Sequence, residues 1–264
     1  MATLKNTTIN DTGFLQIPTG TTAQRPASPV TGMVRWNTTL GQAEMFNGSI
    51  WVRVSSAIPT EGLAFYVDAG QATSYPGSGS TWYDISGYSR NLSMGAGVTY
   101  VNQFGGVLEF AENSTGYARL DGSSFNLSSS NNTVVSWVRK MTNGNEGRTI
   151  TAWQNNWLMA HHDTTYGDYY AEGWITEGQG TSDTRWRQFA VTGNVISDVW
   201  QSYINDGFII SSNNGSQGPN GWNINSQYDQ FSHCQISCII AYNRVLSAEE
   251  ITSIYTFYRS RFGV

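Results

Sequence analysis

The sequence is poor in charged residues, which make up 12% of its 264 residues and leave a net charge of −5. This balance provides no broad attraction to nucleic acid or to anionic lipid, and we expect neither as a partner. No apolar run approaches the roughly 20 residues of a membrane-spanning helix, so we expect no membrane insertion. The first residues also lack the apolar core of a secretion signal, and we therefore expect synthesis and assembly in a cytoplasm.

Cysteine is scarce, with only Cys234 and Cys238. If both lie on one strand, their Cα atoms are about 13 Å apart at ~3.3 Å per residue, beyond the reach of a disulfide of about 7 Å. His233 would point to the face opposite Cys234 on such a strand, which opposes a shared metal site. We expect two buried thiols without a bridge.

The sequence also lacks the spaced carboxylates of a glycoside hydrolase, which retaining enzymes hold about 5 to 5.5 Å apart. Glu172 and Glu177 are the nearest pair, and their odd separation places them on opposite faces of a regular strand. The run His161, His162 and Asp163 suggests a base or a metal cluster, but adjacent histidines point apart on a strand and a turn is the simpler explanation. We expect that the protein is not an enzyme.

What the sequence does contain is glycine, with 28 residues, and aromatic residues, which make up 13% of the chain. Short strand-like runs alternate with turn signals such as Asn47-Gly48 and Asn205-Asp206-Gly207. This pattern predicts an all-β protein. We expect a small N-terminal β-meander over residues 1–58, followed over residues 59–264 by an antiparallel β-sandwich with a short C-terminal helix.

The start of that helix is the clearest local signal. Ser247 can cap the first N–H groups, and Glu250 can return a hydrogen bond to the cap, which makes a capping box. Leu246 and Ile251 have the spacing of the accompanying hydrophobic staple. Gly263 suits the end of the helix.

Four segments, in order, resemble parts of laminin-G-like, or concanavalin A-like, jelly-roll domains. They are the opening strand at 62–68, the D-x-S-G loop at 82–87, the paired strands at 186–207, and the strand-to-helix segment at 242–251. Such sandwiches often hold a calcium ion at a loop edge. The resemblance thus makes calcium a candidate cofactor, with Asp68, Asp84 and Asp163 as ligands, although Asp84 also suits a turn carboxylate that bonds its own backbone.

Residues 1–58 form a piece too small to bury much surface alone, so we expect it to lean on the following domain, on another copy or on a larger assembly. The run at 24–54 resembles segments of bacteriophage tail-fibre and virion structural proteins, in which such repeats form intertwined or trimeric β-modules. The resemblance implies a homotrimer and other virion proteins as partners. The residues expected at the oligomer or attachment surface are Met33, Trp36, Phe46 and Trp51.

Aromatic residues in turn-rich segments are candidates for stacking on sugar rings, beside abundant Asn and Asp. The alternative is that these rings fill the core or a subunit interface. The long polar loop at 213–225, which carries one tryptophan, is also typical of a binding tip. The candidates for carbohydrate binding are Trp82, Tyr88, Trp157, Tyr166 and Trp222.

Two hypotheses of function remain. The first is a bacteriophage virion structural protein, a surface fibre, spike or capsid-decoration subunit on the virion surface, assembled in the host cytoplasm and displaying a lectin-like sandwich. The alternative is a carbohydrate-binding adhesin that recognises host surface glycan.

Overall fold

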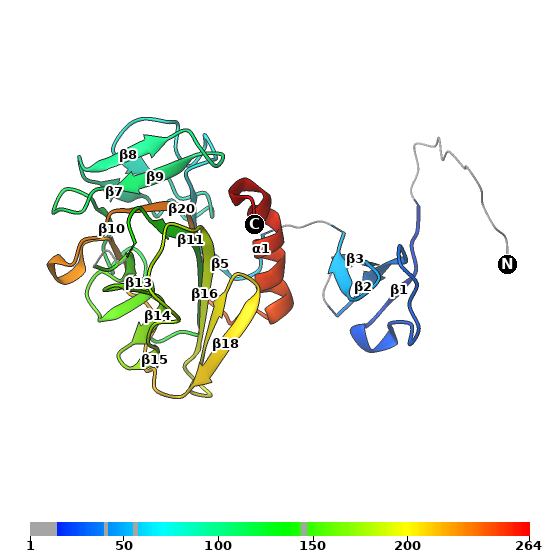
Figure 1. The fold of residues 1–264 in the computed structure, drawn as a ribbon. Coiled ribbons are helices and arrows are strands. Elements are labelled where there is room, and N and C mark those ends of the chain that lie inside the picture. Colours follow the sequence, from blue (N-terminus) through cyan, green and yellow to red (C-terminus); the bar gives the residue numbers. More distant parts are fainter. Residues whose placement is uncertain (1–14, 40–41, 55–57, 144–146) are drawn as a thin grey trace. The chain divides into compact units, whose positions relative to one another are not determined.

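The computed structural model describes residues 15–39, 42–54, 58–143 and 147–264. The chain forms two compact units, Met1–Ala57 and Ile58–Val264 (Figure 1). The division falls one residue before the boundary expected from the sequence. We describe each unit by itself, as the small unit and the sandwich unit.

The small unit contains one four-stranded sheet in the order β1-β2-β3-β4. Strands β2 to β4 form the predicted antiparallel meander, and β1 pairs parallel to β2, which the sequence analysis did not anticipate. In the turn after β3, the Asn47 side chain accepts hydrogen bonds from the backbone of Ser49 and Ile50, both at 3.0 Å. The elements are β1 (Thr19–Gly20), the 3-10 turn η1 (Thr22–Gln24), β2 (Val34–Asn37), β3 (Gln42–Phe46) and β4 (Trp51–Arg53).

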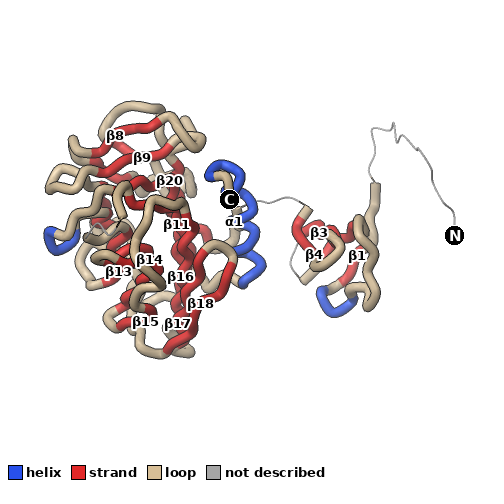
Figure 2. The backbone as a smooth tube through the Cα atoms, viewed as in Figure 1, coloured by secondary structure: helices blue, strands red, loops and turns tan. Residues whose placement is uncertain are grey.

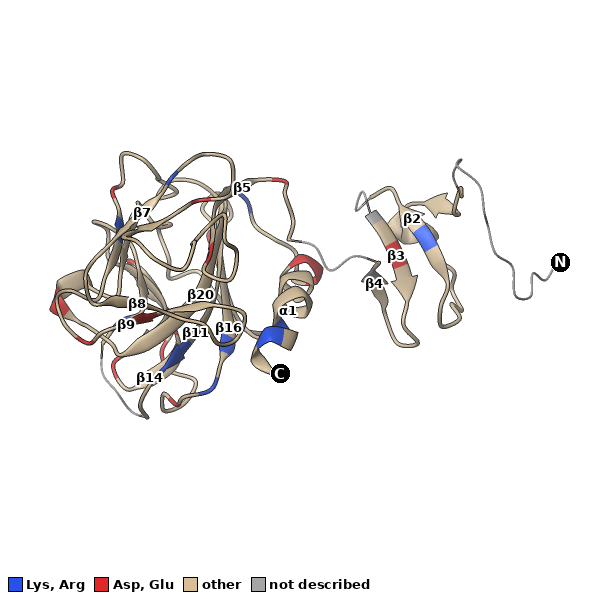
Figure 3. Ribbon diagram, turned by 90° about the horizontal axis from the view of Figure 1, so that it is seen from above, with Lys and Arg blue, Asp and Glu red and all other residues tan. Residues whose placement is uncertain are grey.

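One face of this sheet buries charged and polar groups instead of apolar ones. Glu44 is 1% exposed, and Arg35 and Asn37 are buried beside it. The Glu44 carboxylate accepts hydrogen bonds from Arg25 at 2.7 Å and from Asn37 at 3.0 Å, and Arg35 lies 3.5 Å away. Burial raises the pKa of Glu44, but these hydrogen bonds outweigh it and hold the pKa below its ordinary value. Figure 3 shows the basic and acidic segments on the neighbouring strands β2 and β3.

The opposite face of the same sheet is apolar. Residues paired across antiparallel strands share a face, and the register places Val34 opposite Met45, Trp36 opposite Ala43, and Met45 opposite Val52. We call these five residues the apolar face. Trp36 remains 42% exposed there. The small unit therefore has an ionic interior and carries apolar side chains on its outside.

The sandwich unit packs an eight-stranded sheet against two four-stranded sheets, and all its strand pairs are antiparallel (Figure 1). This architecture confirms the predicted all-β fold. The large sheet runs in the order β18-β17-β16-β11-β20-β9-β8, and β5 also pairs with β20. Its strands are β5 (Leu63–Asp68), β8 (Val98–Val101), β9 (Val107–Phe110), β11 (Asn132–Lys140), β16 (Arg187–Asn194), β17 (Val199–Ile204), β18 (Gly207–Ser212) and β20 (Cys234–Tyr242).

The two smaller sheets supply the other layer. One has the order β19-β10-β7-β6, with β6 (Thr81–Trp82), β7 (Leu92–Met94), β10 (Ala118–Leu120) and β19 (Trp222–Ile224). The other has the order β12-β13-β14-β15, with β12 (Ile150–Thr151), β13 (Trp157–His162), β14 (Thr165–Ala171) and β15 (Trp174–Thr176). A 3-10 turn, η2 (Gln227–Asp229), and the helix α1 (Ala248–Phe262) complete the unit.

Strand β20 is buried at all nine positions because both of its faces are covered. One face contributes Ile236 and Ile239 to the core between the sheets. The other contributes Cys238 and Ile240 to a second core beneath α1, which lies along the outside of the large sheet (Figure 2). A strand covered on both sides usually has a near-continuous apolar sequence, and β20 follows this pattern except at Gln235 and Ser237, which are buried as well.

The predicted helix start is confirmed. Ser247 Oγ accepts from the N–H of Glu250 at 3.3 Å, and the Glu250 carboxylate accepts from the N–H of Ser247 at 3.0 Å. Leu246 and Ile251 are both buried, as the hydrophobic staple requires. Gly263 ends the helix with φ of 71°, a left-handed conformation that suits glycine.

A buried polar network ties this helix to the first strand of the unit. Arg261 Nη1 donates to the two carboxylate oxygens of Asp68 at 2.9 and 3.0 Å. The Tyr258 hydroxyl donates to the same carboxylate at 2.9 Å and lies 2.8 Å from the Tyr66 hydroxyl. These contacts join residues near the two ends of the unit. No helix within the described residues is long and apolar enough to cross a membrane.

Candidate functional site

Three of the predicted sugar-binding aromatics are core residues. Trp82, Trp157 and Trp222 have no exposed surface. Trp222 stacks on Phe125 with ring centroids 5.2 Å apart and meets Trp157 edge-on at 6.0 Å. The prediction that these tryptophans bind sugar is wrong, because their faces pack between the two layers of the sandwich.

The loop expected to be a binding tip is also held against the sandwich. Asn220 accepts hydrogen bonds on its side-chain oxygen from the N–H groups of Gln154 at 3.1 Å and Asn155 at 3.0 Å. Asn155 in turn donates to the carbonyl of Gly218 at 2.6 Å. Hydrogen bonds thus fix this polar segment to the turn at Gln154 and Asn155, and Trp222, which follows it, lies in the core.

Tyr88 has a different environment, since it is 58% exposed and borders a cavity of about 190 Å³. Phe125 contributes an aromatic ring to the lining, and polar side chains come from three separate loops. The polar lining residues are Arg90, Asn126, Ser130 and Asn243. Among the five predicted sugar-binding residues, Tyr88 is thus the one that the structure places in a polar concavity. We call this concavity the Tyr88 pocket.

The carboxylate of Asp84 builds the loop that carries Tyr88. One of its oxygens accepts from the N–H groups of Tyr66 and Ser86, both at 2.9 Å. The other accepts from the Ser86 hydroxyl at 2.8 Å and the Arg90 N–H at 2.9 Å. Four donors thus converge on one side chain and fix the backbone on both sides of Tyr88. The interpretation of Asp84 as a turn carboxylate agrees with this geometry.

Arg90 lies between two aromatic rings of the pocket. Its guanidinium carbon is 4.4 Å from the centroid of Tyr88 and 5.5 Å from that of Phe125. Nη1 donates to the carbonyl of Ala64 at 2.6 Å. Cation–π contacts of this kind hold both partners in place. The pocket therefore presents an ordered phenol ring and a half-buried cation side by side.

Tyr166, the fifth candidate, is half-buried and covered on one ring face. The guanidinium of Arg187 lies 3.9 Å from the ring centroid and is fixed by two hydrogen bonds to Asp183, at 2.6 and 2.9 Å. The covered face has no room for a sugar ring. A role in sugar binding for Tyr166 remains a prediction for its other face.

The three aspartates predicted to bind calcium lie apart. Asp68 is paired with Arg261 and Tyr258, and Asp84 is occupied by backbone and hydroxyl donors, so the prediction that these two coordinate a metal is wrong. Asp163 lies in the turn after β13 with an exposed carboxylate 3.6 Å from His162. Within the described part of the chain, no group of three or more His, Cys, Asp or Glu residues is arranged to hold a metal ion.

His161, which the sequence raised as a possible base, is a buried structural residue. Its Nδ1 lies 2.9 Å from the hydroxyl of Ser182, which itself donates to the carbonyl of Thr165 at 2.6 Å. Nδ1 therefore carries the proton and donates to Ser182. Burial, with smaller contributions from the charges of Lys140 and Arg187, lowers the pKa of His161 to about 3. The ring is neutral at physiological pH.

The two cysteines behave as predicted. Both lie on β20, both are buried, and neither forms a disulfide. Burial raises the pKa of each thiol to about 12, so neither is a nucleophile at neutral pH. The neighbouring His233 instead lies 2.8 Å from the carboxylate of Glu109.

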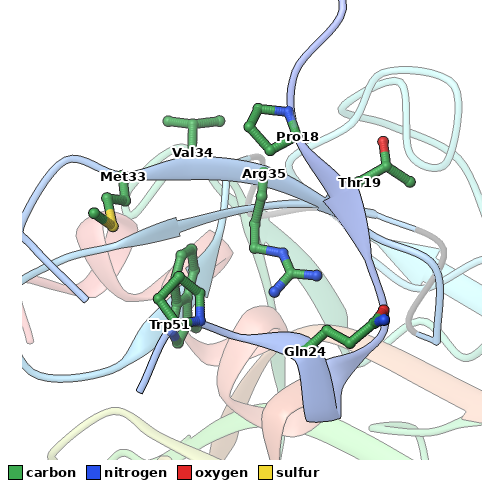
Figure 4. Close-up of a pocket in the computed structure, with 8 residues that line it drawn as sticks. Pro18, Thr19, Gln24, Met33, Val34, Arg35 and Trp51 are labelled. Atoms are coloured by element: carbon green, nitrogen blue, oxygen red, sulfur yellow. The ribbon is translucent and has the colours of Figure 1, made fainter. Parts of the chain in front are cut away.

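A second concavity, of about 490 Å³, lies on the small unit (Figure 4). Met33 and Trp51 form apolar walls around the aliphatic part of Arg35, and Pro18 closes one side, whereas the Val34 side chain points to the other face of the sheet. Of the residues predicted for the oligomer surface, Met33 and Trp51 thus border this groove. Phe46 packs against Trp51 with centroids 5.7 Å apart, whereas Trp36 belongs to the apolar face on the other side of the sheet. The four residues therefore do not form one surface.

No protein-family model matches the sequence, and no curated protein sequence matches it. Solved structures do share the fold. One is the binding domain of Paraclostridial Mosquitocidal Protein 1, with a TM-score of 0.58 and 17% identity over 75% of this chain and 53% of that one. Another is the ligand binding domain of Botulinum neurotoxin serotype D in complex with N-acetylneuraminic acid, with a TM-score of 0.55 and 14% identity over 75% and 51%.

Trypanosoma rangeli sialidase matches with a TM-score of 0.52 and 16% identity over 75% of this chain and 33% of its own. The matched region thus spans about half of the toxin domains and a third of the sialidase. At this level of identity, the likeness establishes a shared β-sandwich fold and carries no residue of either protein over to this chain.

The sequence analysis missed Arg90, Asn126 and Asn243 as members of the pocket. Arg90 follows Tyr88 by two residues, just after the D-x-S-G loop, so its position next to Tyr88 could have identified it from the sequence. Asn126 and Asn243 lie 36 and 153 residues further along the chain than Arg90, and local pattern alone does not bring them together.

Proposed function

We propose that the protein binds carbohydrate, with the Tyr88 pocket of the sandwich unit as the site. The observation that carries this proposal is the exposed ring of Tyr88, fixed by Arg90 at 4.4 Å beside the amides of Asn126 and Asn243. Sugar recognition requires an apolar ring face to stack on the C–H side of the sugar and polar groups to bond its hydroxyls. The pocket provides both kinds of group on an ordered loop.

The size of the pocket indicates which part of a glycan it accepts. A volume of about 190 Å³ is below the roughly 300–1,000 Å³ of sites that enclose a small molecule. The pocket therefore suits the terminal sugar of a chain whose remaining residues lie outside. The fold supports the proposal only in general terms, since two of its structural relatives are binding domains and one was solved with N-acetylneuraminic acid.

A glycan array with the purified protein tests this proposal. Tyr88→Ala removes the stacking ring, and binding is expected to fall at least tenfold for every glycan that the unaltered protein retains. Tyr83→Ala is the matched control, because Tyr83 is 44% exposed on the same segment and does not line the pocket. Near-ultraviolet circular dichroism checks that both variants fold. Equal binding by both variants, or no glycan bound by the unaltered protein, contradicts the proposal.

A second candidate function, a displayed subunit of a larger assembly such as a bacteriophage virion fibre, is favoured by the small unit. Its apolar face carries no charged side chain, so two copies can meet there without burying charge. The interior of the unit is ionic, so burial of its apolar face requires a partner surface from outside the unit. We propose that this partner is the same face of further copies, in the predicted trimer.

Light scattering coupled to size-exclusion chromatography tests this assembly. A trimer is expected at micromolar concentration, and Trp36→Glu is expected to convert it to a monomer by placing a charge on the apolar face. Ile196→Glu is the control, since Ile196 is 90% exposed on the sandwich unit and receives the same charge. A monomeric unaltered protein, or a trimer that survives Trp36→Glu, contradicts the proposal.

A further inference from the structure

The guanidinium of Arg90 is half-buried, yet it uses few of its hydrogen-bond donors within the protein. Among the residues that the structure describes, its one hydrogen-bond acceptor is the carbonyl of Ala64, at 2.6 Å, and it has no carboxylate partner. A guanidinium presents several N–H donors in a planar fork that matches a carboxylate or a sulfate. The remaining donors of Arg90 are therefore available to a ligand in the pocket.

The carboxylate on the same loop is already engaged, and so is the carboxylate that pairs with the residue after Asn243. The Asp84 carboxylate accepts the backbone N–H of Arg90, together with donors of Ser86 and Tyr66, and makes no ion pair with the guanidinium. Glu250, on α1, is paired with Arg244 at 2.6 Å. Among the described residues, the guanidinium of Arg90 thus has two ring faces and the carbonyl of Ala64 as partners but no carboxylate, and an anionic ligand would supply that partner.

The other polar groups add to this preference for an acceptor-rich ligand. The side-chain oxygen of Asn126 accepts the N–H of Ser128 at 2.9 Å, which leaves its amide N–H groups as donors. The net charge of −5 provides no general attraction for anions, so any preference for acids arises in the pocket itself.

We propose that the Tyr88 pocket selects acidic sugars, with Arg90 binding a carboxylate or sulfate of the terminal residue while Tyr88 stacks on its ring. This inference rests on the proposed function and specifies its ligand class. Arg90 is then the specificity-determining residue of the site, and Asp84 is a positioning residue that holds the loop.

The test is an array of matched oligosaccharides that share one core and end in a neutral hexose, a uronic acid, a sialic acid, the methyl ester of either acid, or a 6-sulfated hexose. The acidic members are expected to bind at least tenfold more tightly than the neutral and esterified members. Arg90→Gln is expected to reduce acidic binding to the neutral level, and Arg90→Lys is expected to retain part of the preference because it keeps the charge without the planar fork.

Arg119→Gln is the control, because Arg119 also lies over a ring, 4.0 Å from Tyr117, but outside the pocket. Its binding profile is expected to match the unaltered protein. Equal binding of acidic and neutral members that depends on Tyr88 overturns the inference and leaves the proposed function standing. Acid selectivity that survives Arg90→Gln overturns the assignment to Arg90. Failure of the unaltered protein to bind any member overturns the proposed function and the inference together.

Discussion

Acidification should destabilise the sandwich unit through a single buried ring. The pKa of His161 is lowered to about 3, whereas an unfolded histidine titrates near pH 6.5. Below about pH 6.5, His161 is therefore protonated in the unfolded chain but stays neutral in the folded protein. Stability linked to this group is complete above that pH and falls as the pH decreases toward 3.

The loss of unfolding free energy follows from the difference between the pKa values of His161 in the folded and unfolded states. Each pH unit below about 6.5 costs about 1.4 kcal/mol while the folded ring stays neutral, so at pH 5 the loss is about 2 kcal/mol relative to pH 7. His161→Asn removes the titration and keeps an amide donor for the hydroxyl of Ser182, 2.9 Å from the ring in the parent. The variant is expected to be less stable overall because it is smaller, but less dependent on pH.

Urea unfolding followed by near-ultraviolet circular dichroism at pH 7 and pH 5 measures both quantities. The difference in unfolding free energy between the two pH values is expected to be about 2 kcal/mol smaller in His161→Asn than in the parent. His162→Asn is the comparison variant: His162 is half-buried and its pKa is also lowered, so this variant is expected to reduce the pH dependence by less than His161→Asn does. An identical pH dependence in the parent and His161→Asn would refute the assignment of a buried, neutral ring.

Three further predictions concern other parts of the sandwich unit. Asp68→Asn breaks the ion pair with Arg261 and leaves that cation without its carboxylate. The free energy of unfolding, measured by urea titration, is expected to drop by about 3 kcal/mol. A change below about 1 kcal/mol would contradict a stabilising role of the pair. Because Asp68 and Asp84 are occupied by protein donors, a chelator is expected to leave the melting temperature unchanged, and a clear decrease would indicate a metal held elsewhere. Cys234 and Cys238 are expected to react with a thiol reagent only after denaturation, and rapid labelling of the native protein would be inconsistent with their burial.

Structural features that depend on residues a few positions apart could be predicted from the sequence. The capping box of Ser247 and Glu250 and the hairpin after β17 are of this kind, because caps and turns are decided by neighbouring residues. The unbridged cysteines followed from strand geometry alone. The all-β class followed from the alternation of short strand-like runs with turn signals, and Tyr88 was selected as a candidate because it is an aromatic residue in a turn-rich segment.

Burial and contacts that depend on residues far apart in the sequence could not be predicted from local pattern. Turn-rich surroundings suggested exposure for Trp157 and Trp222, but the packing of one layer on another buries both. In the small unit, Val34 and Trp36 alternate with Arg35 and Asn37 along β2, and this alternation does not indicate which face is covered. The answer depends on Arg25, which reaches Glu44 across 19 residues and turns the polar side inward.

The pairing of β5 has a consequence for biosynthesis. Among the strands that the structure describes, β5 has β20 as its one neighbour, and Asp68 meets Arg261 across 193 positions. A nascent chain emerging from the ribosome must leave this apolar strand unpaired until β20 has been synthesised. Closure of the sandwich therefore waits for β20, and a chain that stopped before Cys234 would leave β5 without its strand partner.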